Sequence, residues 1–259
     1  MEDYHATGRR KIACAAWCPA NNSFVHLNMN KKKLVVLTGA GISAESGLKT
    51  FRDSDGLWEG YDIEEVATPR AWKRDPALVL DFYNMRRKNV LAAEPNKAHQ
   101  ILASFQDKFD VHIITQNIDD LHERAGSYSV LHLHGEILKM RSDQDPALVQ
   151  EIRSDMIYGA LAPDGHAWRP DVVWFEEPVP RISQAVPIVR SADIFLVVGT
   201  SLLVYPAAGL VDYAPHDIPR YIVDKKIPYA GSMSNLHAIE GPATEGMARL
   251  AEMLNKNDI

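Results

Sequence analysis

Cysteine is nearly absent from this chain of 259 residues. The two cysteines, Cys14 and Cys18, both lie near the amino terminus, so the rest of the chain contains no thiol. A disulfide framework in the core and a four-cysteine zinc site are therefore both excluded.

Long apolar runs and an excess of positive charge are missing as well. No apolar run approaches the roughly 20 residues that a membrane-spanning helix needs. The formal net charge of -6 argues against broad nucleic-acid binding, because a phosphate backbone attracts a basic face. We therefore expect a protein with neither a membrane nor a nucleic acid as its partner.

The amino-terminal stretch GRRKIACAAWCPA combines basic, apolar and small residues, as a secretory signal peptide does. Its apolar part, Ile12 to Trp17, is shorter than the roughly 7 to 15 residues that such a peptide needs, and we expect a cytoplasmic protein. Met29 stands directly before NKKKLVVLTGAG, where a compact domain would begin. We interpret residues 1–28 as an extension, disordered or not native, and residues 29–259 as a single domain.

Apolar runs typical of buried strands alternate with helical patterns. The runs lie at residues 33–38, 110–115, 193–200 and 220–224, and the helical patterns at residues 75–92, 96–109 and 241–256. This alternation predicts an α/β fold, a Rossmann-like parallel sheet with helices on both faces. Two segments, about 45–92 and 136–170, interrupt the alternation and would form a small lobe. A cleft between lobe and sheet is the natural ligand site.

The stretch GAGISAESGLKTFR, residues 39–52, follows the first predicted strand. Gly39, Gly41 and Ala44 satisfy the pattern G-x-G-x-x-G/A, whose glycines permit a tight turn and a close approach to a pyrophosphate. A dehydrogenase would continue with a helix, a second strand and an acidic residue about 20 residues later. Here glycines interrupt the helix and no such strand follows, which disfavours hydride transfer. A purely structural turn remains an alternative.

Polar residues follow the second strand in TQNIDDLHERAG, residues 115–126. Gln116, Asn117 and Asp119 are able to hold a carboxamide or ribose hydroxyls at the strand end, where open α/β sheets bind ligands. The alternating stretch VLHLHGE then places His132 and His134 on the same face. A single histidine is more often structural, but a glycine turn beside a nucleotide cleft makes His134 a catalytic candidate.

Together these motifs resemble those of the sirtuin family of NAD-dependent protein-lysine deacylases. The set GAGISAESG…TFR, TQNID, His134-Gly135, RPDVVWF, VVGTSL and GPATEGM has the family's order between about Lys33 and Leu250. The resemblance implies that the acyl-lysine carbonyl oxygen attacks C1′ of the nicotinamide ribose of NAD. Nicotinamide would leave, and O-acyl-ADP-ribose would be released.

The resemblance also implies roles for single residues. His134 would be the general base toward the ribose hydroxyls, for which the ordinary histidine pKa of about 6.5 is suitable, and Asn117 would share the catalytic site. Phe51 would cover the reacting ribose, and Arg52 would meet the ribose and phosphate side of NAD. The other implied NAD-binding residues are Gly39, Ala40, Gln116, Asp119, Gly199, Thr200, Ser201, Asp224 and Ala243.

A substrate preference is implied by FYNMRR, in which Tyr83 and Arg86 share one face of a predicted helix. In the sirtuin subclass that removes acidic acyl groups, a Tyr-x-x-Arg pair in this helix engages the distal carboxylate of succinyl- or malonyl-lysine. Arginine offers a carboxylate a planar charged fork, and tyrosine adds a hydroxyl donor. A surface helix with ordinary arginines is the alternative. The predicted walls of the acyl-lysine tunnel are Val172, Trp174 and Phe175.

The chain departs from the family in the small lobe, after the WF of the substrate strand, and at Asp224, where asparagine is common. Most members carry four cysteines in the small lobe that bind zinc, whereas residues 136–170 contain none, so we expect no metal. We expect packing to hold the lobe instead, through Met156, Ile157, Tyr158, Leu161 and Trp168. Glu176 replaces the glycine that usually follows WF in the strand that pairs with substrate, where a side chain would alter the approach of a peptide.

Other functions remain open. An NAD hydrolase or ADP-ribosyltransferase would use the same activated ribose with water or another nucleophile. A non-catalytic NAD-binding module is disfavoured by His134 together with Asn117 and Asp119. A short-chain dehydrogenase is disfavoured because no acidic residue ends a second strand after the glycine turn. The partner expected for a deacylase is an acylated lysine in a protein or peptide.

Overall fold

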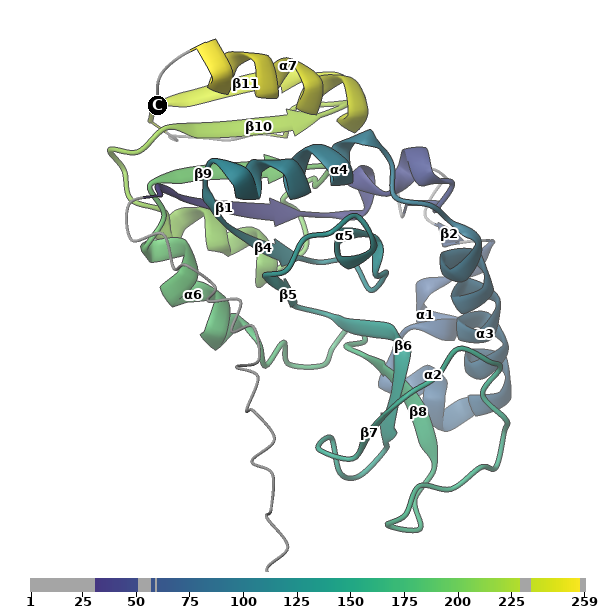
Figure 1. Cartoon of the computed structure of the whole chain (residues 1–259). Coiled ribbons are helices and arrows are strands. Elements are labelled where there is room, and N and C mark those ends of the chain that lie inside the picture. The colour runs from purple at the N-terminus through teal and green to yellow at the C-terminus, as the bar shows by residue number, and fades with distance from the viewer. Residues whose placement is uncertain (1–30, 51–56, 59, 229–233, 257–259) are drawn as a thin grey trace, which may run out of the picture. The chain divides into compact units, whose positions relative to one another are not determined.

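The computed structural model describes residues 31–256 except 51–56, 59 and 229–233 (Figure 1). The chain divides into Met1–Asn30 and Lys31–Ile259, and the fold below is that of the second unit. The extension expected at residues 1–28 and the predicted site residues Phe51 and Arg52 lie outside the described residues, so these interpretations remain predictions.

A parallel sheet of six strands forms the larger part of this unit (Figure 1). In sheet order the strands are β11 (Leu236–Glu240), β10 (Arg220–Asp224), β9 (Ile194–Val198), β1 (Lys33–Thr38), β4 (Asp110–Thr115) and β5 (Val130–His132). From β1 the chain continues to β4 on one side and later returns to β9 on the other. A crevice at the carboxyl ends of β1 and β9 is the expected ligand position in such a sheet.

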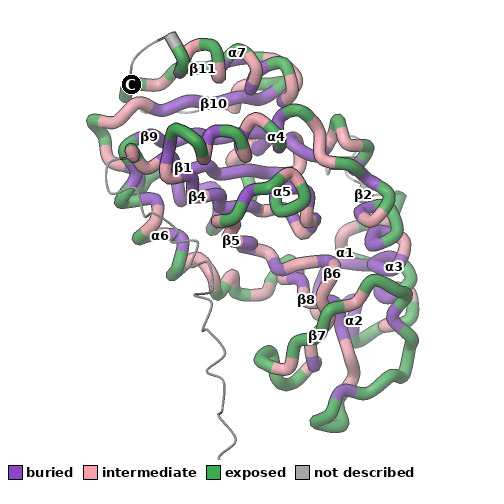
Figure 2. The backbone as a smooth tube through the Cα atoms, in the orientation of Figure 1, coloured by how far each residue is buried: buried purple, intermediate pink, exposed green. Residues whose placement is uncertain are grey.

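Helices bury both faces of the sheet. On one face, α4 (Lys97–Ser104) and α7 (Ala243–Lys256) share an apolar cluster with Leu34 and Val36 of β1. On the other face, α6 (Ile182–Arg190) and the 3-10 helix η4 (Ala207–Tyr213) enclose Val35 and Leu37. Alternate residues of β1 thus enter opposite clusters, which explains its continuous apolar sequence. Figure 2 shows the central strands buried, whereas α7 also carries exposed residues.

The small lobe combines an antiparallel sheet with helices. The sheet has the order β7 (Val149–Glu151), β6 (Gly135–Ser142), β8 (Trp168–Val172). The other elements are a hairpin of β2 (Leu57–Trp58) and β3 (Tyr61–Asp62), and the helices α1 (Ile63–Val66), α2 (Pro69–Arg74) and α3 (Pro76–Ala92). The predicted fold class, a Rossmann-like sheet with a small lobe from two insertions, is confirmed.

Helix α3 begins where its sequence predicts. Asp75 is the N-cap, and its side chain accepts from the backbone N–H of Leu78 at 3.0 Å, while Pro76 occupies the first helical position. Both features satisfy or remove donors that the first turn of a helix leaves without partners.

The packing expected for the long loop of the small lobe is largely wrong. Met156 is buried, and Trp168 packs against the lobe core. Ile157, Tyr158 and Leu161, however, are 76%, 65% and 62% exposed. These three residues lie in a turn-rich segment that faces solvent, so another interaction must hold the loop.

Polar side chains of α3 supply that interaction. Asn84 donates from Nδ2 to the carbonyl oxygen of Met156 at 3.0 Å and accepts from the Met156 N–H at 2.8 Å. Arg87, only 1% exposed, donates to the carbonyl oxygen of Ile137 at 3.0 Å and to Asn84 Oδ1 at 2.8 Å. Buried polar groups require such partners, and here they join α3 to both β6 and the loop.

Candidate active site

Three chain segments meet at the carboxyl ends of β1, β4 and β9. The N–H of Gly39 donates to the carbonyl oxygen of Val198 at 3.0 Å, and the N–H of Gly41 donates to that of Gly199 at 2.8 Å. On the other side, the N–H of Gln116 donates to the carbonyl oxygen of Thr38 at 2.9 Å. The structure therefore brings together the predicted glycine turn, the TQNID segment and the GTS segment.

Glycine is required where the first and third of these segments touch. A Cβ atom at Gly39 would lie 2.7 Å from Cβ of Thr200, and one at Gly41 would lie 2.7 Å from Cα of Gly199. Gly199 has φ 63°, a left-handed conformation that glycine adopts at little cost. The two turns thus present main chain rather than side chains to each other at the crevice.

Ser43 links the predicted site residues into a buried network. Asn117 Nδ2 donates to Ser43 Oγ at 3.1 Å, and the Ser43 hydroxyl donates to Asp119 Oδ2 at 3.1 Å. His99 Nε2 lies 3.5 Å from Ser43 Oγ. Burial raises the pKa of the Asp119 carboxyl, against the hydrogen bonds from Leu121 and Ser43.

Sequence reasoning missed Ser43 and His99. Ser43 stands inside the GAGIS motif, so the motif itself could have identified it. His99 has a local signal, because its Nδ1 accepts from the N–H of Asn96 at 3.3 Å and completes a capping box at the start of α4. Its approach to Ser43 is a long-range contact that no local pattern shows.

His134 has the geometry of a neutral base. Its Nδ1 lies 3.0 Å from the carbonyl oxygen of Gln116, and a carbonyl oxygen only accepts, so Nδ1 carries the proton and Nε2 keeps its lone pair. Burial lowers the pKa of His134, against the hydrogen bond to Gln116. The next residue, Gly135, has φ 81°, and a Cβ there would collide with the carbonyl oxygen of Asp171.

The other predicted NAD residues end or follow the parallel strands at their carboxyl ends. Gln116 Nε2 donates to Thr200 Oγ1 at 3.0 Å. Asp224 ends β10. The residue before it, Val223, accepts at its carbonyl oxygen from the N–H of Gly199 at 2.9 Å. The remaining predicted positions are Ala40 in the short helix after Gly39, Ser201 directly after Thr200, and Ala243 at the start of α7.

The chemistry of this crevice fits NAD. Amides and hydroxyls at Gln116, Asn117 and Thr200 suit a carboxamide and ribose hydroxyls, and the carboxylates of Asp119 and Asp224 accept from hydroxyls. The touching glycine turns leave main chain at the edge where phosphates bind in open α/β sheets.

The predicted acyl-binding residues belong to the core of the small lobe. Tyr83 and Arg86 are buried on α3, and Tyr83 shares an apolar cluster with Val172 and Trp174. Burial raises the pKa of the Tyr83 phenol, against the charge of Arg86. Arg86 is thus not an ordinary exposed arginine, and its role toward the acyl group stays a prediction. Phe175, next along the chain, is 37% exposed.

Glu176 adopts a backbone conformation that favours glycine, with φ 74°. Its carboxylate pairs with Arg70 of α2, which also pairs with Glu64 at 2.8 Å. The N–H of Phe175 donates to the carbonyl oxygen of Ala67 at 3.0 Å. The segment after β8 is thus joined to α2 and to the turn before it.

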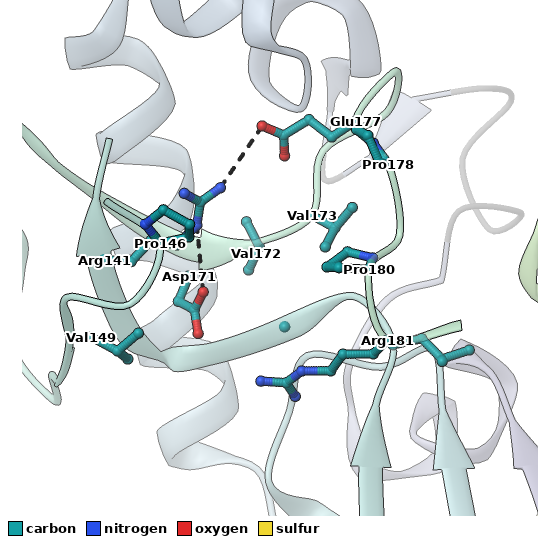
Figure 3. A pocket seen from close by; sticks show the side chains of 12 residues that line it. Arg141, Pro146, Val149, Asp171, Val172, Val173, Glu177, Pro178, Pro180 and Arg181 are labelled. Atoms are coloured by element: carbon teal, nitrogen blue, oxygen red, sulfur yellow. Dashed lines mark ion pairs between the residues drawn. The ribbon is translucent and has the colours of Figure 1, made fainter. Parts of the chain in front are cut away.

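A pocket of about 370 Å³ lies between β6, β8 and the segment that leads to α6 (Figure 3). Figure 3 shows Arg141 between Asp171 and Glu177, at 3.5 Å and 3.9 Å. Glu177 also accepts two hydrogen bonds from Arg169, at 2.7 Å and 3.0 Å. The charges here neutralise one another. Of the predicted site residues that the structure describes, Val172 alone lines the pocket.

In sequence, the chain is similar to known proteins. A model of the Sir2 family matches residues 39–206. A protein of Helicobacter pylori named NAD-dependent protein deacylase is 52% identical over 223 residues, which cover 86% of this chain and 97% of the relative.

Solved structures agree with this placement. A Sir2 homologue in complex with NAD is 38% identical with a TM-score of 0.77, covering 88% of this chain and 91% of that chain. A Sir2 structure with a deacetylated p53 peptide and 3′-O-acetyl ADP-ribose is 28% identical with a TM-score of 0.71, covering 87% of this chain and 95% of that chain. On sequence and fold alike, the chain belongs to the Sir2 family.

Proposed function

We propose that this chain is an NAD-dependent protein-lysine deacylase that accepts succinyl- and malonyl-lysine. The observation that carries the proposal is His134, whose Nε2 is available beside the network of Asn117, Ser43 and Asp119. The Helicobacter pylori relative, named NAD-dependent protein deacylase and matched over 97% of its length, supports the deacylase part of the proposal. The NAD complex of a Sir2 homologue supports the cofactor.

Specific residues would hold NAD. Gly39, Gly199 and Thr200 would take the phosphates, and Gln116 and Asn117 would take the carboxamide and ribose. When bound, NAD supplies an activated ribose carbon and nicotinamide as the leaving group.

His134 would accept a proton at Nε2 from a ribose hydroxyl. The hydrogen bond from Nδ1 to Gln116 fixes the ring and becomes charge-assisted when the imidazole is protonated. The low pKa of His134 keeps the base free at neutral pH. Burial around the ring limits access of water, which favours transfer to the acyl group over hydrolysis.

The preference for acidic acyl groups rests on Tyr83 and Arg86. Both are buried, Tyr83 within the apolar cluster of the small lobe. Away from water, a guanidinium and a hydroxyl bind a carboxylate more strongly than they do in water. The side chains come from one face of one helix, so the two donors reach the same ligand group.

Mass spectrometry of the products tests the function. The protein is incubated with NAD and an acetyl-, succinyl- or malonyl-lysine peptide, or with no peptide. We expect nicotinamide only with peptide, together with O-acyl-ADP-ribose, and faster with the acidic acyl groups. Release without peptide would instead identify an NAD hydrolase, and no turnover would identify a binding module.

A further inference from the structure

His132 ends β5, two positions before His134, and is only 4% exposed. Its Nδ1 lies 2.9 Å from the carbonyl oxygen of Asn117, and its Nε2 lies 2.8 Å from Oε1 of Glu123. A carbonyl oxygen and a carboxylate both accept hydrogen bonds. Both ring nitrogens must therefore donate, which only the imidazolium can do.

Acidic groups surround His132 on several elements. Glu123 belongs to α5 (Leu121–Arg124), Glu136 belongs to β6, and Glu123, His132 and Glu136 line a cavity of about 270 Å³. Burial lowers the pKa of His132, but the hydrogen bond and charge of Glu123 outweigh it, so the pKa is raised. Among the described residues, the other charged or titratable groups that line this cavity or lie close to His132 are Asp119, Asp120, His122, Lys139, Glu151, Arg153 and Arg181.

The two histidines hold consecutive peptide groups. His134 donates to the carbonyl oxygen of Gln116, and His132 donates to that of Asn117. The side chain of Gln116 reaches Thr200, and that of Asn117 reaches Ser43. By holding the backbone of Gln116 and Asn117, the two histidines also hold the side-chain amides of these residues in position.

We propose that His132, held as an imidazolium by Glu123, is a positioning residue that orients Asn117 for deacylation. The inference rests on the proposed function. His132 contacts the loop and not the reacting atoms. Loss of its proton at high pH removes one of its two donors, so either the Asn117 carbonyl or Glu123 loses its hydrogen bond. The upper limb of the activity profile would then belong to His132 and the lower limb to His134.

Nuclear magnetic resonance tests the charge state in the protein without NAD. Imidazole ¹⁵N spectra of wild type, assigned with His132→Gln, should show one histidine with both nitrogens protonated at pH 7. Glu123→Gln should lower the pKa of that histidine by about 1 to 3 pH units. An imidazole at position 132 that titrates at or below about 6.5 in wild type overturns the proposal.

Kinetics test the positioning role. Glu123→Gln should lower kcat by about tenfold or more, because small displacements of a site are costly, while KM for the peptide changes little. Its alkaline limb should move to lower pH. His112→Gln is the matched control, since His112 also contacts a carboxylate, Asp110 at 3.1 Å, but nearer the amino end of β4. A Glu123→Gln protein with wild-type kcat and alkaline limb overturns the proposal.

The affinity for NAD separates this inference from the proposed function. If wild type releases no nicotinamide with any peptide, the proposed function fails. Calorimetry with NAD alone then decides: Glu123→Gln should bind NAD several-fold more weakly than wild type and the His112→Gln control. Equal affinities would overturn the positioning role, even if His132→Gln fails to fold.

Discussion

At the residue scale, different surroundings give His132 and His134 different protonation states. His134 uses one ring nitrogen as a donor and keeps a lone pair on the other, whereas both nitrogens of His132 face acceptors. Burial alone would leave both neutral, so the carboxylate of Glu123 makes the difference.

Replacing His134 tests its role as the base. His134→Asn should lower kcat for nicotinamide release with peptide by about 10²- to 10⁴-fold, the usual contribution of a positioned base. In wild type the acid limb should lie below about pH 6.5, because burial lowers the pKa of His134 and the neutral form is lost only as the pH falls through that lowered value. The parallel change His112→Asn should leave kcat unchanged. A His134→Asn protein with most of its activity would exclude the assignment.

Arg86 should set the preference for acidic acyl groups. Arg86→Met should lower kcat/KM for a succinyl-lysine peptide by about 10- to 100-fold, the value of a lost charged hydrogen bond, and should lower that for an acetyl-lysine peptide much less. Lys88→Met, on the exposed side of the same helix, controls for the loss of a positive charge. Equal loss on both peptides would rule out the specific role.

At the element scale, strands were easier to predict than loops. β1, β4 and β10 have the bounds that their apolar runs predicted, because both faces of these strands are buried. β9 ends before its run does, since Gly199 turns the chain at φ 63°. β11 was missed because most of LHAIE is partly or fully exposed and carries no apolar run.

The site was predictable to the extent that it follows strand ends. Gln116 and Asn117 closely follow β4, so strand assignment alone predicted their place at the carboxyl end of the sheet. Thr200 was implied only by the resemblance to the sirtuin family. The contact of His99 with Ser43 and that of His132 with Glu123 depend on how α4 and α5 pack. A single sequence does not encode such long-range geometry in any local pattern.

Helix α3 holds the loop of the small lobe through hydrogen bonds, which predicts unequal effects of mutation. Asn84→Ala should lower the free energy of unfolding by about 2 kcal/mol or more, because it leaves buried backbone groups of Met156 without partners. Tyr158→Ala, at an exposed position expected from sequence to pack, should change it by about 0.5 kcal/mol or less. Urea denaturation measures both, and equal effects would contradict this account of the lobe.

At the scale of the whole molecule, buried histidines couple folding to pH. Burial lowers the pKa of His99 to about 4 and lowers that of His122 and His134.

In the described part of the chain, every helix is too short or too polar to span a membrane. Among the same residues, no three His, Cys, Asp or Glu side chains are placed to hold a metal ion. The expectation of a zinc-free lobe stays a prediction.

Stability should therefore fall in acid. The unfolded chain binds protons at these histidines from about pH 6.5 downward, whereas the folded protein binds them only at lower pH, so unfolding becomes easier as the pH falls. His99 alone would cost roughly 3 kcal/mol below pH 4. His132 acts oppositely, because its raised pKa stabilises the fold below about pH 6.5 and this contribution is lost as the pH rises through the raised value. Urea midpoints from pH 7.5 to 4.5 measure the balance, and a flat profile would contradict it.

Glu176, the residue after WF, holds a backbone conformation at φ 74° that is strained for any residue but glycine. We therefore expect it to lower the thermal stability of the whole chain. Glu176→Gly should raise Tm by roughly 2 to 4 °C, because glycine adopts this conformation without about 1 kcal/mol of backbone strain. Arg70→Ala removes only the exposed ion pairs with Glu176 and Glu64 and should leave Tm nearly unchanged. A thermal scan of both variants measures this, and a lower Tm for Glu176→Gly would refute it. One substitution would then give an enzyme of higher thermal stability. Any loss of activity in the same variant would show that the Glu176 side chain contributes to turnover.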